Sequence, residues 1–261
     1  MDITKTSDFW WLSEEQASQA WLIGLGHHRE DDDRRITLHD LDPDQPTLLD
    51  WDHSLNERGE GSGLFTAYPL SFMNEWCLRW DNHNVYRTMK MFPESGHGEA
   101  ILGPLLVDID SQDWKSQPLE DLEAALRMAR HAITVVIQEW GLKPEEDVRI
   151  FFSGRKGFNI EAIPSRLDIT GNIDQQIRTS AGCLDTIRQE LGISADGPTI
   201  DPVYGNRYGF RLKHPYIRLH DSVNCWRSSA VTQRRRRVRL TIDELSGLSM
   251  ARILQLAEAS P

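Results

Sequence analysis

The stretch GPLLVDID, residues 103–110, is an apolar run that ends in two aspartates one residue apart. Side chains alternate between the two faces of a β-strand, so Asp108 and Asp110 are expected on one face and Ile109 on the other. Two carboxylates this close repel each other unless a proton or a cation lies between them. The pattern therefore predicts either a solvated strand end or a pair of carboxylates that holds a metal ion.

The segments on either side of this strand predict an α+β fold, with a mixed central sheet and packed helices. Strand candidates are apolar throughout or alternate in polarity; they are residues 75–80, 84–92, 101–110, 148–152, 158–164, 216–223 and 234–241. Helix candidates have apolar residues at helical spacing; they are residues 13–25, 118–142, 173–193 and 241–259. Ser13 is expected to begin the first helix, and Thr241 with Glu244 has capping-box spacing in the last.

The order of these elements predicts three parts. Residues 1–75 are expected to form an acidic N-terminal accessory region, and residues 76–241 the core. Residues 242–261 are expected to form a C-terminal helical segment that packs on the core. The central strand would then end where such folds commonly place ligand sites.

The composition is that of a soluble globular protein: of 261 residues, 39% are hydrophobic and 26% are charged. No apolar run has the length of a membrane span, and the N-terminus lacks the pattern of a signal peptide. The three cysteines, Cys77, Cys183 and Cys225, are scattered, which argues against a disulfide framework and against a zinc site. These features predict a cytoplasmic protein without membrane partners.

The charge is unevenly distributed along the chain. The net charge of −11 alone argues against an anionic partner, and the runs EDDD (30–33) and DLDPD (40–44) make the N-terminal region acidic. Residues 207–239, in contrast, are rich in arginine and include Asp221 as their one acid. This basic stretch could face a polyanion, or it could be shielded by the acidic N-terminal region.

The segment FFSGRKGFNI, residues 151–160, predicts a tight turn between two apolar strands. Its glycines, Gly154 and Gly157, would let the backbone approach a ligand closely, and backbone N–H groups in such a turn can cradle phosphate. Arg155 and Lys156 would supply positive charge, and Ser153 a hydroxyl group. A plain hairpin turn with solvated cations is the alternative, and the spacing is not that of a P-loop.

The segment from Thr199 to Asn224 holds further candidates. Asp201 follows an apolar residue and could be a third carboxylate for metal, or a loop acid before Pro202. His214 could contact nucleic acid, or it could be an ordinary surface histidine.

These three segments, in this order, resemble the catalytic core of the archaeo-eukaryotic primase superfamily, which includes the small primase subunits and the primase-polymerases. The motifs are an apolar strand ending in Asp-x-Asp, Ser-Gly-x-Lys-Gly between strands, and an apolar residue with Asp leading to an "RL…SV" strand. The resemblance covers about residues 84–258. It implies a core with an RRM-like sheet and template-directed nucleotidyl transfer from nucleoside triphosphates.

The resemblance assigns roles to individual residues. It implies that two Mg²⁺ or Mn²⁺ ions are held by Asp108, Asp110 and Asp201. The expected nucleotide-binding residues are Ser153, Arg155, Lys156, Asn159 and Arg218. The residues expected to contact a single-stranded nucleic acid template are Arg87, Lys90, His214, Arg235 and Arg237. A helicase or accessory subunit would be a further partner, and no zinc is expected.

The chain departs from the family pattern at two positions. Asn159 and Asn224 stand where the family often has histidine, and asparagine can neither carry charge nor shuttle a proton. Three functions therefore stay open: a primase or primase-polymerase, a primase-like domain that binds nucleic acid or nucleotide without polymerising, and an unrelated metal-dependent enzyme acting on a nucleotide-sugar.

Overall fold

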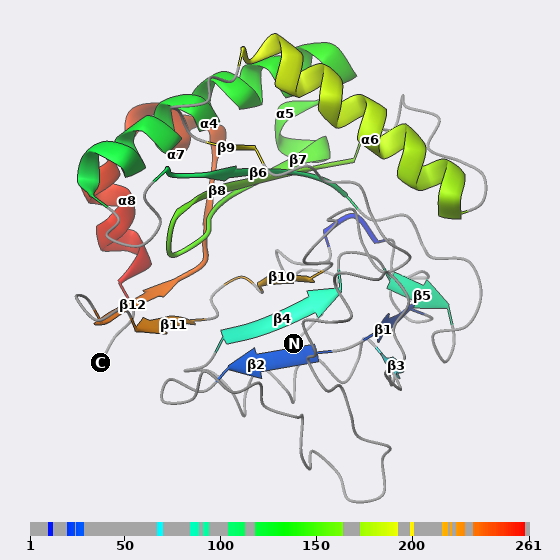
Figure 1. Ribbon diagram of the computed structural model, residues 1–261, viewed down its shortest axis with the longest axis horizontal. Coiled ribbons are helices and arrows are strands. Elements are labelled where there is room, and N and C mark those ends of the chain that lie inside the picture. The colour runs from blue at the N-terminus through cyan, green and yellow to red at the C-terminus, as the bar shows by residue number, and fades with distance from the viewer. Residues whose placement is uncertain are drawn as a thin grey trace, which may run out of the picture.

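A computed structural model of the protein describes the following residues: 10–12, 20–23, 25–28, 67–69, 84–88, 91–93, 104–112, 118–163, 173–192, 199–200, 216–218, 220, 223–227 and 232–258. Within them, helices and antiparallel sheets form an α+β fold (Figure 1). The predicted fold class is confirmed.

A five-stranded sheet forms the centre of the fold. Its strands, in spatial order, are β13 (Val238–Leu240), β7 (Val148–Phe152), β8 (Gly157–Ala162), β6 (Leu105–Asp110) and β9 (Thr199–Ile200). Every neighbouring pair in this sheet is antiparallel. The expectation of a mixed sheet is therefore wrong for the described strands.

The chain connectivity explains this arrangement. Helix α4 (Leu119–Trp140) carries the chain from β6 to β7, two strands that run in the same direction but are not neighbours. The β7–β8 hairpin places β8 between them, and helix α6 (Ile173–Glu190) leads on to β9. This is the split β-α-β-β-α-β topology of ferredoxin-like and RRM-like sheets.

The two faces of this sheet differ in chemistry because side chains alternate along each strand. The pairs Val107–Ile160 and Ile109–Phe158 in the β6–β8 register lie on one face, which is apolar and fully buried. The pair Asp108–Asn159 lies on the other face. We call this second face the polar face.

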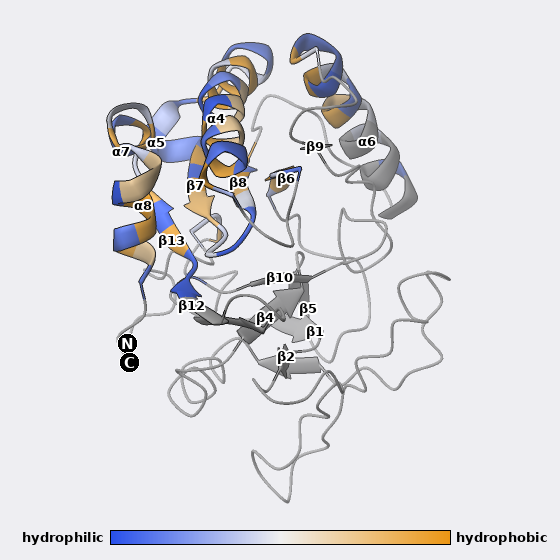
Figure 2. Cartoon of the chain, turned by 60° about the vertical axis from the view of Figure 1, so that its left-hand side comes forward, coloured by the Kyte–Doolittle hydropathy of each residue, from blue (hydrophilic) through white to orange (hydrophobic). Residues whose placement is uncertain are grey.

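The apolar face packs against helices. Helix α4 contributes an apolar stripe, and α6, α7 (Ile242–Gly247) and α8 (Met250–Ala257) add to the same hydrophobic core (Figure 2). A one-turn helix, α5 (Pro144–Asp147), precedes β7. None of the described helices is both long and apolar enough to cross a membrane.

Local signals set the ends of these helices. Gly141 ends α4 in the left-handed conformation, with a φ of 61°, which glycine adopts without a steric penalty. The predicted capping box of α7 is present, because Thr241 Oγ1 accepts from the Glu244 N–H and the Glu244 carboxylate accepts from the Thr241 N–H.

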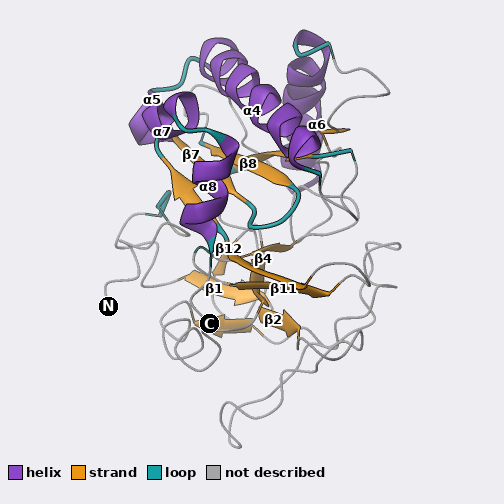
Figure 3. Cartoon of the chain, turned by 90° about the vertical axis from the view of Figure 1, so that its left-hand side faces the viewer, coloured by secondary structure: helices purple, strands orange, loops and turns teal. Residues whose placement is uncertain are grey.

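Three smaller sheets lie on the side of the central sheet away from α4 and α6 (Figures 1 and 3). One contains β3 (Ala67–Pro69), β1 (Ala20–Ile23) and β5 (Met91–Pro93). The second contains β10 (Tyr216–Arg218), β4 (Asn84–Thr88) and β2 (Leu25–His28). The third pairs β11 (Val223–Arg227) with β12 (Thr232–Arg236).

These sheets correct several predicted elements. The helix expected over residues 13–25 is wrong at Ala20–Ile23, which form a strand between β3 and β5. The strand expected over residues 84–92 is two strands, β4 and β5, and the one expected over 216–223 ends at Arg218. The strand expected over 234–241 is interrupted at Arg237. Residues 75–80 lie outside the described residues.

The predicted boundary near residue 75 separates strands that pair with each other. β1 pairs with β5, and β2 pairs with β4, so strands from the predicted accessory region share sheets with strands from the predicted core.

Gly157 gives a direct test of the β6–β8 pairing. A Cβ atom at Gly157 would lie 1.8 Å from the backbone oxygen of Ile109, so Gly157→Ala requires the two strands to separate. We expect a loss of at least about 3 kcal/mol in the free energy of unfolding, the upper end of the cost of overpacking. Urea denaturation followed by circular dichroism measures it.

Gly182→Ala is the matched control. Gly182 lies within α6, and a Cβ there meets no atom within 4 Å. This variant should be more stable than the wild type by about 0.5–1 kcal/mol, because alanine favours a helix. Equal stability of the two variants would contradict the close β6–β8 approach.

Candidate metal and phosphate site

Asp108 and Asp110 lie near the C-terminal end of β6, with their side chains on the polar face. Both are largely buried, with Asp108 3% and Asp110 7% exposed. In the antiparallel register they lie opposite Asn159 and Gly157 of β8. The strand that precedes them is buried, so the predicted arrangement of a core strand with two fixed carboxylates on one face is confirmed.

The turn from Ser153 to Gly157 lies beside these carboxylates and is shaped by the serine side chain. Ser153 Oγ accepts hydrogen bonds from the N–H groups of Arg155 and Gly157, at 3.3 and 3.2 Å. Gly154 has a φ of 76°, and a Cβ there would lie 2.7 Å from the backbone oxygen of Arg236. Two of the N–H groups predicted to cradle phosphate are thus directed at Ser153.

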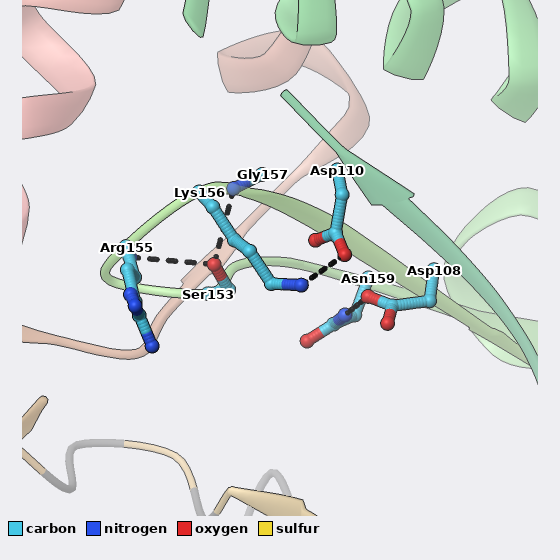
Figure 4. A network of polar contacts seen from close by, with 7 residues as sticks. All are labelled: Asp108, Asp110, Ser153, Arg155, Lys156, Gly157 and Asn159. Atoms are coloured by element: carbon cyan, nitrogen blue, oxygen red, sulfur yellow. Dashed lines mark hydrogen bonds and ion pairs between the residues drawn. The ribbon is translucent and has the colours of Figure 1, made fainter. Parts of the chain in front are cut away.

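The same turn directs a cation at the carboxylates. Lys156 Nζ forms an ion pair with Asp110 Oδ2, while Arg155 lies on the far side of the turn (Figure 4). The Lys156 side chain is 33% exposed, so it reaches from solvent to a nearly buried carboxylate. An ammonium group here contributes the positive charge that two neighbouring carboxylates require.

Asn159 faces Asp108 across the β6–β8 pair. Its Nδ2 donates to Asp108 Oδ1 (Figure 4), and its Oδ1 accepts from Arg237 Nε at 3.4 Å. The amide is 6% exposed. In the structure Asn159 contacts the Asp108 carboxylate. Its predicted contact with a nucleotide stays a prediction.

Glu161 is a polar-face residue that the sequence reasoning missed. It is 1% exposed, and its carboxylate accepts from Arg237 Nη2 at 2.8 Å and from Trp10 Nε1 at 3.2 Å. Strand alternation was the available signal, because Glu161 lies two residues beyond Asn159 in an apolar strand. Arg149 lies over the Trp10 ring, with its guanidinium carbon 4.5 Å from the ring centroid.

Arg237 is not a surface cation. It is 0% exposed, its guanidinium carbon lies 3.5 Å from the centre of the Phe151 ring, and it is ion-paired with Glu161. The predicted contact of Arg237 with a template is therefore wrong for this conformation, because the side chain points into the protein.

Arg235 is partly buried, and its strand position pairs with Glu258. Burial lowers the pKa of Arg235, and the nearby charge of Glu258 acts in the opposite direction. Its predicted contact with nucleic acid stays a prediction.

Other predicted site residues fall outside the described part of the structure. Asp201, Lys90 and His214 lie outside it altogether, although β9 ends at Ile200, opposite Ile109. The side chains of Arg87 and Arg218 are not described, although their backbones lie in the paired strands β4 and β10.

The donor set fits a hard divalent cation in part. Carboxylate oxygens are the ligands that Mg²⁺ and Mn²⁺ prefer, and Asp108 and Asp110 offer them from one strand face. Among the described residues, no three His, Cys, Asp or Glu side chains gather closely enough to hold a metal ion between them. The two carboxylates would need further ligands from water, substrate or a residue outside the described ranges.

Comparison with solved structures identifies a fold relative. The chain is similar to the polymerase domain from Mycobacterium tuberculosis Ligase D in complex with DNA, with a TM-score of 0.53 and 15% sequence identity. The match covers 92% of this chain and 82% of the solved chain. Neither protein-family models nor curated proteins give a match to the sequence. At this identity the likeness shows the fold, which is primase-polymerase-like.

The Lys156–Asp110 ion pair predicts competition between the ammonium group and a divalent cation. A partly exposed ion pair contributes up to about 1 kcal/mol. In the absence of nucleotide, Lys156→Met should therefore bind Mn²⁺ roughly 5-fold more tightly than the wild type does. Electron paramagnetic resonance of free Mn²⁺ measures this affinity. Arg155→Met is the control, because it removes a cation from the same turn on the side away from Asp110. Equal changes in the two variants would show that general charge, not the ion pair, sets the affinity.

Proposed function

We propose that the protein is a nucleotidyltransferase of the primase-polymerase type, which forms phosphodiester bonds from nucleoside triphosphates on a nucleic acid template. The observation that carries the proposal is the arrangement of Asp108, Asp110 and Lys156. Two carboxylates on one strand face lie next to a lysine at a glycine-containing turn, which is the combination that a metal-bound triphosphate requires.

The fold supports the same proposal. The polymerase domain of Ligase D, which is similar over most of this chain, was solved in complex with DNA. The split β-α-β-β-α-β sheet of this chain presents its carboxylates from β6, an interior strand between β8 and β9. A site at the end of an interior strand is held by the core rather than by a loop.

The residues of the chain would divide the work as follows. Asp108 and Asp110 would hold Mg²⁺ or Mn²⁺, with Asp201 as a third ligand. A bound divalent cation lowers the pKa of an attacking hydroxyl and offsets the charge of the phosphates. Lys156 would exchange Asp110 for phosphate oxygens, and Arg155 would add positive charge at the same turn. Positioning and charge stabilisation supply most of the catalysis in phosphoryl transfer.

A template would be bound by cations on strands β4, β10 and β12. Arg235, Arg87 and Arg218 remain proposed contacts to nucleotide or nucleic acid. Binding through such contacts would weaken steeply with salt, because it releases condensed counterions.

A second function is favoured by the contacts of Asp108. Its carboxylate accepts from the Asn159 amide, which belongs to a buried network and, unlike the histidine that the resembling family often has at this position, cannot carry charge or a proton. This observation favours a primase-like domain that binds nucleic acid or nucleotide without polymerising. Retained template binding with no incorporation in any metal would select this function.

Primer extension on a single-stranded DNA template tests the proposal. With Mg²⁺ and Mn²⁺ in parallel, and with ribonucleotides and deoxynucleotides, the wild type should incorporate nucleotides. Asp108→Asn and Asp110→Asn should each lose at least about 100-fold, because even the outer partners of metal ligands are worth 10–100-fold. An unprimed template in the same assay separates priming from extension.

Asp185→Asn is the matched control for these variants. Asp185 is exposed on α6 and has a surface ion pair with Arg188 at 3.6 Å, so its loss should leave incorporation unchanged. Normal incorporation by Asp108→Asn or Asp110→Asn would contradict the proposed site, as would loss of folding in either variant.

A further inference from the structure

The polar face contains a buried ion pair that the proposed chemistry does not use directly. Arg237 and Glu161 have side chains that are both 1% exposed, and their Nη2 and Oε1 atoms are 2.8 Å apart. Taking two charges out of water costs several kcal/mol per ion, and apolar side chains of similar volume often serve stability equally well. Stability alone is therefore a weak explanation for this pair.

The contacts of the pair connect it to Asp108. The guanidinium of Arg237 bonds Glu161 through Nη2 and Asn159 through Nε, and Asn159 donates in turn to Asp108. At the other end, Trp10 Nε1 donates to the second oxygen of Glu161. The chain of contacts thus runs from Trp10 to the carboxylate through buried groups. We call Glu161, Arg237 and Asn159 the relay.

The chemistry of these groups sets the orientation of the amide. A guanidinium only donates hydrogen bonds, so the Asn159 oxygen must face Arg237 and the NH₂ group must face Asp108. If the amide turned over, its oxygen would face a carboxylate oxygen and its NH₂ group would face a cation, and both contacts would be repulsive. Glu161 and the Phe151 ring hold Arg237 in turn, with the guanidinium carbon 3.5 Å from the ring centroid.

We propose that Arg237 is a positioning residue for the metal site. Through Asn159 it fixes the orientation of the Asp108 carboxylate, so that the affinity of the site for a divalent cation depends on a residue that touches neither cation nor nucleotide. This inference rests on the proposed function, because it assigns Asp108 to a metal. Partners that orient metal ligands typically change metal affinity 10–100-fold when they are removed.

The test is Mn²⁺ binding without nucleotide or template, measured by electron paramagnetic resonance of free Mn²⁺. The main variant is Glu161→Leu/Arg237→Met, which removes one positive and one negative charge together. The net charge near the site is then unchanged, and no buried charge is left without its partner. We expect this variant to fold, by circular dichroism, and to bind Mn²⁺ at least about 10-fold more weakly.

A double-mutant cycle tests whether the effect passes through the amide. Asn159→Ala should weaken Mn²⁺ binding by a similar factor, and adding Glu161→Leu/Arg237→Met to it should cause little further loss. If the losses of Mn²⁺ affinity caused by Asn159→Ala and by Glu161→Leu/Arg237→Met multiplied when the variants were combined, the ion pair would act by a route other than Asn159. That result would overturn the relay.

Arg130→Met is the control for a general loss of stability. Arg130 donates to the backbone oxygens of Leu245 and Leu248, both at 2.7 Å, and so belongs to the helical side of the sheet. Its loss should lower the melting temperature without changing Mn²⁺ affinity. An equal loss of affinity in Arg130→Met would overturn the inference.

Asp108→Asn separates the failure of the inference from the failure of the proposed function. If the wild type binds Mn²⁺, Asp108→Asn does not, and Glu161→Leu/Arg237→Met binds like the wild type, the relay is wrong and the metal site stands. If the wild type binds no Mn²⁺, both are wrong. Should the double variant not fold, Glu161→Gln replaces it, and unchanged Mn²⁺ affinity in Glu161→Gln overturns the relay.

Discussion

The antiparallel pairing of β6 with β8 is the constraint on which the rest of the structure depends. It joins Leu105–Asp110 to Gly157–Ala162 without a break, and it brings the backbone of Gly157 so close to Ile109 that no side chain fits between them. Because side chains alternate along a strand, this one register places Phe158 and Ile160 on the face that packs against the helices, and Asn159 and Glu161 on the polar face. A slip of one residue would exchange the two sets.

The two faces of the sheet have opposite energetic roles. Each apolar side chain buried under α4 contributes about 1.5–3 kcal/mol, and the core contains many of them. The polar face buries Asp108, Asp110, Glu161 and Arg237, and breaking a buried ion pair costs about 3–5 kcal/mol. The fold therefore tolerates buried charges on the polar face for two reasons. These charges are paired or hydrogen-bonded, and the apolar face supplies most of the free energy of folding. Carboxylates held in this way cannot swing away from a ligand.

Much of the central fold was predictable because its signals are local. The strand ending in Asp108 and Asp110, helix α4 with Gly141 after it, and the turn at Ser153 each follow from a short stretch of residues. Contacts between distant residues were not predictable in this way. Ala20–Ile23 form a strand through pairing with β3 and β5, which overrides helical spacing.

The same limit applies to the site. Lys156 was found because its turn is a local pattern, but its pairing with Asp110 joins residues 46 positions apart. Arg237 was misassigned because the run of arginines does not show where the strand breaks, and the break turns this one side chain inward to Glu161.

The measurement that tests the account most directly is anomalous scattering from crystals soaked with Mn²⁺ and a non-hydrolysable nucleoside triphosphate. The account predicts a manganese peak at the Asp108 and Asp110 carboxylates, with Lys156 turned to the phosphates; a nucleotide bound without manganese at these carboxylates would contradict it.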